Sequence, residues 1–66
     1  MLSDSDFIHA VARQVAEGGW SSFVNIAKDE EEAISMVEGG WSTIYDVVSS
    51  QDIDSLREDY SHIDED

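Results

Sequence analysis

Carboxylates are the most abundant chemically active groups of this chain, and they gather in its second half. Sixteen Asp and Glu residues oppose three Lys and Arg, which gives a net charge of −13 over 66 residues. Residues 1–28 hold three carboxylates against Arg13 and Lys28, whereas residues 29–66 hold thirteen against Arg57. A field of one sign attracts cations and repels phosphate groups. The composition predicts a basic protein partner and argues against direct binding of nucleic acid or anionic lipid.

The acidic residues have the charge to stand in for a nucleic acid. A globule of this length is roughly 28 Å across, and duplex DNA of that length carries about 16 charges. We therefore expect a DNA mimic, a non-catalytic inhibitor or regulator of a basic nucleic-acid-handling protein. Small acidic phage and mobile-element proteins that block restriction, repair or CRISPR machinery have this type of composition. The expected contact residues are Asp29, Glu30, Glu31, Glu32, Glu38, Asp46, Asp52, Asp54, Glu58, Asp59 and the aromatic Trp41.

The same acidity is also compatible with three roles that involve no DNA mimicry. The carboxylates could serve solubility alone. The chain could be a general acidic protein-interaction module, possibly homodimeric. Adaptation to high salt is the third role, but it should coat the whole surface, whereas residues 1–28 are nearly neutral.

Catalysis has little support in the sequence. The chain has no Cys, which excludes thiol chemistry, and it lacks a Gly-x-Ser-x-Gly elbow around a nucleophile. A pair of catalytic carboxylates would need a pocket that separates their proton affinities, and so small a core scarcely encloses one. We predict neither an enzyme nor a cofactor.

Metal binding is also weakly indicated. Asp52-Ile53-Asp54 begins like a calcium loop, but Leu56, Arg57 and Ile63 stand where that loop needs oxygen ligands, a glycine and a glutamate. Glu58 and Asp59 lie at helical spacing from His62 and could hold a divalent ion weakly. A solvated helix end is the interpretation that we favour, and no metal site is predicted.

Asp54-Ser55-Leu56 resembles the phosphopantetheine attachment motif of acyl carrier proteins, which are also small, acidic and helical. The resemblance covers three residues and would make Ser55 the attachment site. In that family the serine begins a long helix, whereas here only ten residues follow Leu56. Ser55 also falls inside a predicted helix for which Asp52 is the expected cap.

A short internal repeat organises the chain. Glu-Gly-Gly-Trp-Ser occurs at residues 17–21 and again at 38–42, an offset of 21 residues. Each copy predicts the end of one helix, a turn and the start of another. We expect the first glycine of each pair to adopt the left-handed conformation that stops a helix. Ser21 and Ser42 are expected to cap the helices that follow. The tryptophans are expected to pack across the corners in the core, and if one of them is exposed, Trp41 is the expected interface residue because it lies in the acidic half.

The spacing of apolar residues predicts an all-α bundle of four or five short helices, with a single domain at 1–63 and a frayed acidic tail at 64–66. No strand-like alternation stands out. The first helix has a Ser-x-x-Asp capping signal at Ser3. The expected helices are 4–17, 21–28, 29–38, 42–49 and 52–62. Their expected apolar faces hold Phe7, Ile8, Val11 and Val15; Phe23, Val24, Ile26 and Ala27; Ala33, Ile34 and Val37 with Met36 beside them; Ile44, Tyr45, Val47 and Val48; and Ile53, Leu56, Tyr60 and Ile63.

No targeting signal is apparent in the sequence. The first residues lack a basic start, and the apolar stretches are interrupted by His9, Arg13 and Gln14. No run reaches the roughly 18 apolar residues of a membrane span. The expected location is the cytoplasm.

Overall fold

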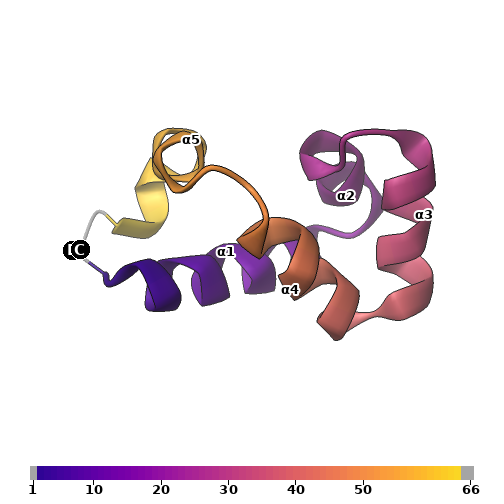
Figure 1. Ribbon diagram of the computed structural model, residues 1–66, viewed down its shortest axis with the longest axis horizontal. Coiled ribbons are helices and arrows are strands. Elements are labelled where there is room, and N and C mark those ends of the chain that lie inside the picture. The colour runs from indigo at the N-terminus through magenta and orange to yellow at the C-terminus, as the bar shows by residue number, and fades with distance from the viewer. Residues whose placement is uncertain (1, 65–66) are drawn as a thin grey trace.

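The computed structural model describes residues 2–64, and these residues form helices and turns with no strand (Figure 1). The predicted all-α fold class is confirmed. The molecule measures 32 × 18 × 17 Å. Its elements are α1 (Asp4–Gly18), α2 (Trp20–Ile26), α3 (Glu30–Gly39), α4 (Trp41–Ser49), α5 (Ile53–Asp59) and the 3₁₀ turn η1 (Ser61–Asp64).

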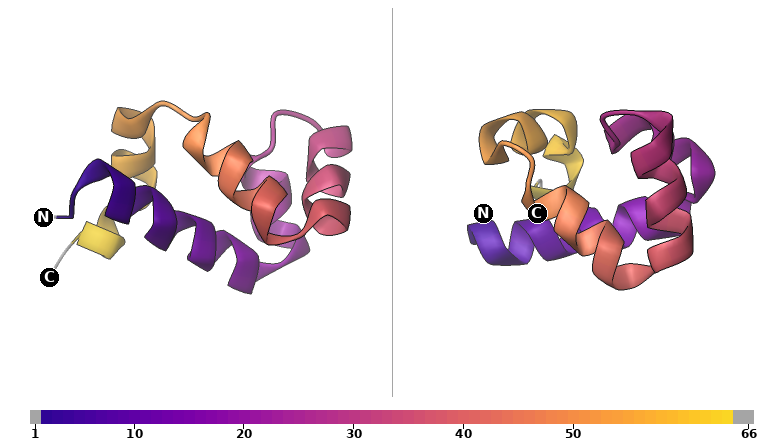
Figure 2. Two further views of the ribbon diagram at one scale, coloured as in Figure 1. Left: turned by 60° about the horizontal axis from the view of Figure 1, so that its bottom comes forward. Right: turned by 45° about the vertical axis from the view of Figure 1, so that its right-hand side comes forward.

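The long helix α1 organises the arrangement, because α2, α4, α5 and η1 all contact it. Helices α2 and α3 pack together at one end of the long axis, while α5 and η1 lie at the other (Figure 1). Helix α4 lies between them. In the views of Figures 1 and 2, α5 and the turn that leads into α3 lie on the same side of the molecule, away from α1. This layout places the two acid-rich segments, around the start of α3 and along α5, at opposite ends of one side of the molecule.

The core is built around one apolar face of α1. Phe7, Val11 and Val15 recur every four residues and are almost completely buried, as their spacing predicts. Ser3 caps the helix by accepting a hydrogen bond from the Asp6 amide at 3.2 Å. The other helices bury Phe23, Ala33, Met36, Ile44, Val47, Val48 and Leu56 against this face.

The predicted buried face of α3 is confirmed at Ala33 but wrong at Ile34 and Val37. Ile34 and Val37 are 42% and 54% exposed, whereas Met36 is fully buried beside Ala33. Two i, i+3 apolar pairs lie next to each other in this sequence, and they face directions about 100° apart on the helix. The neighbours of α3 cover the Ala33–Met36 pair, which the local sequence cannot reveal. Val24 of α2 is likewise half exposed rather than in the core.

The two Gly-Gly junctions have the same backbone geometry, but the predicted roles of their glycines are wrong. The second glycine of each pair has the positive φ: 69° at Gly19 and 67° at Gly40, with ψ near −147°. The first glycine is the last residue of its helix. A Cβ on Gly18 would lie 1.9 Å from the Ser22 hydroxyl, and one on Gly39 would lie 1.9 Å from the Thr43 hydroxyl. The first glycine therefore allows close approach, and the second makes the turn.

The capping prediction for Ser21 and Ser42 is also wrong. Helices α2 and α4 begin one residue earlier, with Gly19 and Gly40 at the N-cap positions and no side-chain cap. The tryptophans consequently occupy the first helical positions, directly after the turn. Trp20 is 49% exposed and Trp41 is 43% exposed, so neither is the core residue that the repeat predicted.

The predicted fifth helix is shorter than expected. Helix α5 ends at Asp59, where Tyr60 leaves the helical conformation with φ −118° and ψ 37°. The chain then turns into η1, so that Tyr60 and Ile63 both pack against the core. A continuous helix could not bring η1 back to α1. Of the predicted tail 64–66, Asp64 ends η1, and the rest lies outside the described residues.

Candidate partner-binding surface

The carboxylates lie at the surface and have few cationic partners. Every Asp and Glu side chain from residue 4 to residue 59 is exposed except that of Glu32, which is partly buried. Among the side chains of residues 2–63, the structure shows one ion pair, between Arg57 and Asp4 at 2.8 Å. The negative charge of the second half is therefore directed toward solvent.

The first acidic group, Asp29–Glu32, begins α3 and partly stabilises it. The Glu32 amide donates to Oδ1 of Asp29 at 2.8 Å, and the Lys28 amide donates to Oε1 of Glu32 at 3.0 Å. The pair resembles a capping box, except that Glu32 accepts from the amide before the N-cap residue and not from that of Asp29 itself. Glu30 and Glu31 are exposed in the first turn, where the helix dipole also favours negative charge.

The second acidic group, Asp52, Asp54, Glu58 and Asp59, belongs to α5 and the residue before it. Asp52 occupies the N-cap position, but its Oδ2 accepts from the Ser55 hydroxyl at 3.2 Å instead of from a backbone amide. Glu58 and Asp59 lie in the last turn, where the dipole disfavours negative charge. Helix stabilisation does not explain these two carboxylates.

The structure brings the predicted contact residues together only in part. The two acidic groups share one side of the molecule but stand at its two ends (Figures 1 and 2). Glu38 lies at the far end of α3, about 12 Å along the helix from Glu30 at 1.5 Å per residue. Asp46 is exposed midway along α4. We call the side of the molecule on which these two groups stand the acidic side; Glu38 and Asp46 lie outside the two groups.

Trp41 lies apart from both acidic groups. Its ring is 5.4 Å from the His9 ring of α1 and 6.1 Å from the Tyr45 ring. Trp20, which sequence reasoning assigned to the core, lies beside the first acidic group: with Val24 it lines a hollow that continues over residues 28–30. The repeated sequence does not indicate this difference, because both tryptophans follow the same Gly-Gly turn.

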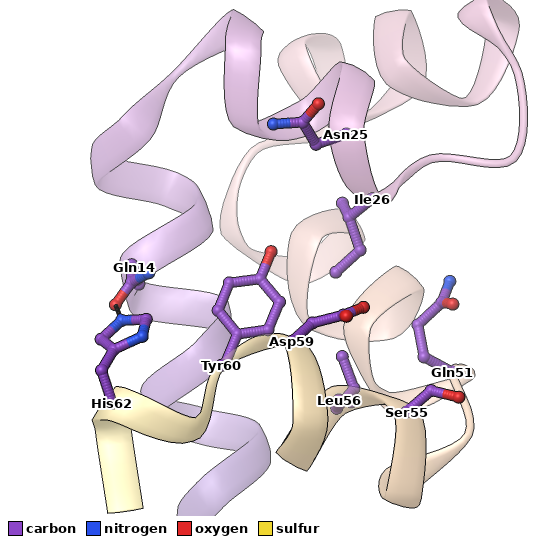
Figure 3. A pocket seen from close by; sticks show the side chains of 9 residues that line it. All are labelled: Gln14, Asn25, Ile26, Gln51, Ser55, Leu56, Asp59, Tyr60 and His62. Carbon is purple, nitrogen blue, oxygen red and sulfur yellow. Dashed lines mark hydrogen bonds between the residues drawn. The ribbon is translucent and has the colours of Figure 1, made fainter. Parts of the chain in front are cut away.

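A cleft of about 370 Å³ opens beside the second acidic group, between α1, α2, α5 and η1 (Figure 3). One end is closed by a 2.7 Å hydrogen bond between His62 and Gln14. Burial, together with the negative charge of the adjacent Asp59, raises the pKa of Tyr60 above its ordinary value. Sequence reasoning missed this cleft, because its polar residues come from segments far apart in the chain.

The weak metal site considered at Glu58, Asp59 and His62 is not formed. Within the described part of the chain, no three side chains of His, Cys, Asp or Glu are placed to hold a metal ion. His62 is instead turned toward Gln14 (Figure 3).

Comparison with protein-family models, with curated proteins and with solved structures finds no match. Among residues 2–64, none of the helices has the length and apolarity that a membrane crossing requires. We therefore infer function from the chemistry of the surface.

Proposed function

We propose that this chain is a non-catalytic inhibitor or regulator whose acidic side binds a basic, nucleic-acid-handling protein in place of DNA. The observation that carries the proposal is the exposure of nearly all described carboxylates together with a single ion pair among residues 2–63. Such a surface accelerates association with a cationic partner and excludes anionic ones.

The positions of particular carboxylates support a role beyond helix stabilisation. Glu38, Glu58 and Asp59 stand in the last turns of their helices, where negative charge costs about 0.3–1 kcal/mol each. A chain that needed acid only for solubility could carry it elsewhere at no such cost. The acidity at these sites is better explained by an interaction that uses it.

The dimensions also support mimicry of DNA. The molecule is 32 Å long, and duplex DNA of that length carries about 19 phosphate charges. Two acidic groups at the ends of one side would follow a phosphate-binding groove along its length. The sixteen carboxylates of the chain approach the charge of the duplex segment, although those of α1 lie outside the acidic side.

A general acidic interaction module is the second candidate, favoured by the apolar side chains exposed near the first acidic group. Trp20, Val24, Ile34 and Val37 are each more than 40% exposed on α2 and α3. Aromatic and aliphatic anchors of this kind carry protein–protein binding, and a duplex offers nothing equivalent.

Competition with DNA separates the two candidates. The protein would be immobilised, exposed to an extract of its source cells and eluted with a salt gradient. The captured basic protein would then be bound to labelled duplex DNA, and displacement followed by fluorescence anisotropy. A mimic must displace the duplex completely. A stable ternary complex would contradict mimicry and favour the module.

A further inference from the structure

The cleft beside α5 combines one carboxylate, a phenol ring, an imidazole ring and several amide groups. Asp59 and Tyr60 approach it from the end of α5, Asn25 and Ile26 from α2, and Gln51 from the segment before α5. In Figure 3 the Tyr60 hydroxyl points toward α2, Ile26 reaches down from above, and Leu56 lies below. The cleft is therefore apolar above and below, with acceptor groups around it.

We propose that this cleft binds a guanidinium group, the end of an arginine side chain of the basic partner. The protein source of the arginine rests on the proposed function, whereas the chemistry of the cleft does not. Asp59 would accept charge-assisted hydrogen bonds, the amide oxygens would accept the remaining N–H groups, and Tyr60 would offer its ring face. Ile26 and Leu56 would contact the apolar stem of the side chain.

The chain already holds one of its own arginines with the same three kinds of group. Nη2 of Arg57 donates to Oδ1 of Asp4 at 2.8 Å and to the carbonyl oxygen of Leu2 at 3.1 Å. The guanidinium carbon lies 4.6 Å from the centre of the Phe7 ring. A carboxylate, an amide-type oxygen and an aromatic ring thus recur in the cleft, which lies against another face of the same helix.

The geometry favours guanidinium over ammonium. Guanidinium is planar, stacks on aromatic rings and presents donors in several directions, whereas an ammonium is a compact, strongly hydrated charge. The cleft offers acceptors from different elements around one ring (Figure 3). Its volume of about 370 Å³ is at the small end for ligand sites, which suits one side chain.

The test is a titration of ¹⁵N-labelled protein followed by NMR, with three probes: the Nα-acetyl amides of arginine, of lysine and of citrulline, the neutral isostere of arginine. The arginine probe should give saturable shifts that cluster at residues 25–26, 51 and 56–60. The lysine probe should bind roughly tenfold more weakly, and the citrulline probe should give no saturable shift. Equal binding of the arginine and lysine probes, or shifts spread over all acidic segments, would overturn the proposal.

Four substitutions in α5 and at its C-cap make the test specific. Asp59→Asn should weaken binding of the arginine probe about tenfold, whereas Asp54→Asn removes the same charge outside the cleft and should change it less than about twofold. Tyr60→Phe keeps the ring and should retain binding, and Tyr60→Leu should lose much of it. Equal effects of Asp59→Asn and Asp54→Asn would show a general ionic atmosphere and overturn the cleft as the site.

The source of the arginine is tested separately. Acetyl-Gly-Gly-Arg-Gly-Gly-amide should bind at least as tightly as free arginine if the ligand is a protein side chain, and clear preference for the free amino acid would overturn that assignment. Failure of the arginine probes with intact, salt-sensitive binding of the captured partner would overturn the cleft and leave the proposed function standing. Binding of the arginine probes in the cleft, with no captured partner that binds in a salt-sensitive way, would overturn the proposed function and leave the cleft assignment standing.

Discussion

The guanidinium of Arg57 covers the ring of Phe7, with its carbon 4.6 Å from the ring centre. Phe7 is a fully buried residue of α1, so a cation on α5 closes the core at the end where α1 begins. The same guanidinium pairs with Asp4 at 2.8 Å. One of the three basic side chains of the chain therefore fastens the last helix to the first.

Replacing Arg57 should loosen α5. Arg57→Ala should lower the free energy of unfolding by about 1–2 kcal/mol, because it removes a cation–π contact and a partly shielded ion pair. Arg57→Lys keeps the charge but loses the planar contact, and we expect it to recover less than half of the loss. Urea unfolding followed by circular dichroism measures both. Full recovery by lysine would show that charge alone matters.

Replacing either glycine of a junction should lower the stability of the protein, but for different reasons. Gly40→Ala forces a Cβ into a positive-φ conformation and should cost about 1–2 kcal/mol. Gly39→Ala meets both the hydroxyl and the Cβ of Thr43. The double variant Gly39→Ala/Thr43→Ala removes the hydroxyl but keeps that Cβ, so it should recover part of the lost stability, whereas Thr43→Ala should not rescue Gly40→Ala. Thermal unfolding of the four variants checks this, and rescue of both glycine variants would contradict the assigned roles.

Matched charge removals at the two ends of α3 should differ in their effect on stability. Glu31 stands in the first turn and Glu38 in the last, so the helix dipole favours the first carboxylate and disfavours the second. Relief of general repulsion is common to both changes and cancels in the comparison. Glu38→Gln should be more stable than Glu31→Gln by about 1 kcal/mol, measured by urea unfolding. Equal stabilities would show that the carboxylate of Glu38 does not destabilise α3.

Local sequence patterns predicted the helices, whereas packing between helices determined which of their side chains are buried and which are exposed. The i, i+4 stripe of α1 and the Ser3 cap were readable because each depends on residues within one or two turns. The choice of Met36 over Ile34 and Val37 depends on where α2 and α4 lie against α3. Trp20 and Trp41 follow identical sequences, yet their neighbours differ because they come from other helices. The cleft could not be predicted for the same reason: Asn25 comes from α2, Gln51 from the segment before α5 and Tyr60 from the turn after it.

Stability should fall above pH 10 through Tyr60. Its folded-state pKa is raised, by burial first and by the charge of Asp59 second, so the folded chain holds the phenolic proton more tightly than the unfolded chain. This contribution is complete below the unfolded value of about 10 and is lost as the pH rises through the raised folded value. Tyr60→Phe should flatten the decline in the free energy of unfolding between pH 9 and 11.5, and Asp59→Asn should reduce it. An unchanged slope in Tyr60→Phe would contradict the assignment.

Salt should stabilise the free protein. With a net charge of −13 on 66 residues, repulsion among exposed carboxylates destabilises the compact state and is screened at high ionic strength. The melting temperature should rise when sodium chloride is increased from 10 to 500 mM (the Debye length falls from about 30 Å to a few ångströms). A melting temperature that is constant or falls over this range would show that the acidic side is compensated in solution.

The central claim, that the acidic side engages a cationic partner, is tested most directly by reversing charge on it. The affinity of the captured partner would be measured for Glu30→Lys/Glu31→Lys, for Asp54→Lys/Glu58→Lys, and for the matched control Asp6→Lys/Glu17→Lys on α1, with folding checked by circular dichroism. Each pair on the acidic side should weaken binding by about tenfold or more, and the control by much less. Unchanged affinity in both acidic-side pairs, or an equal loss in the control, would contradict the claim.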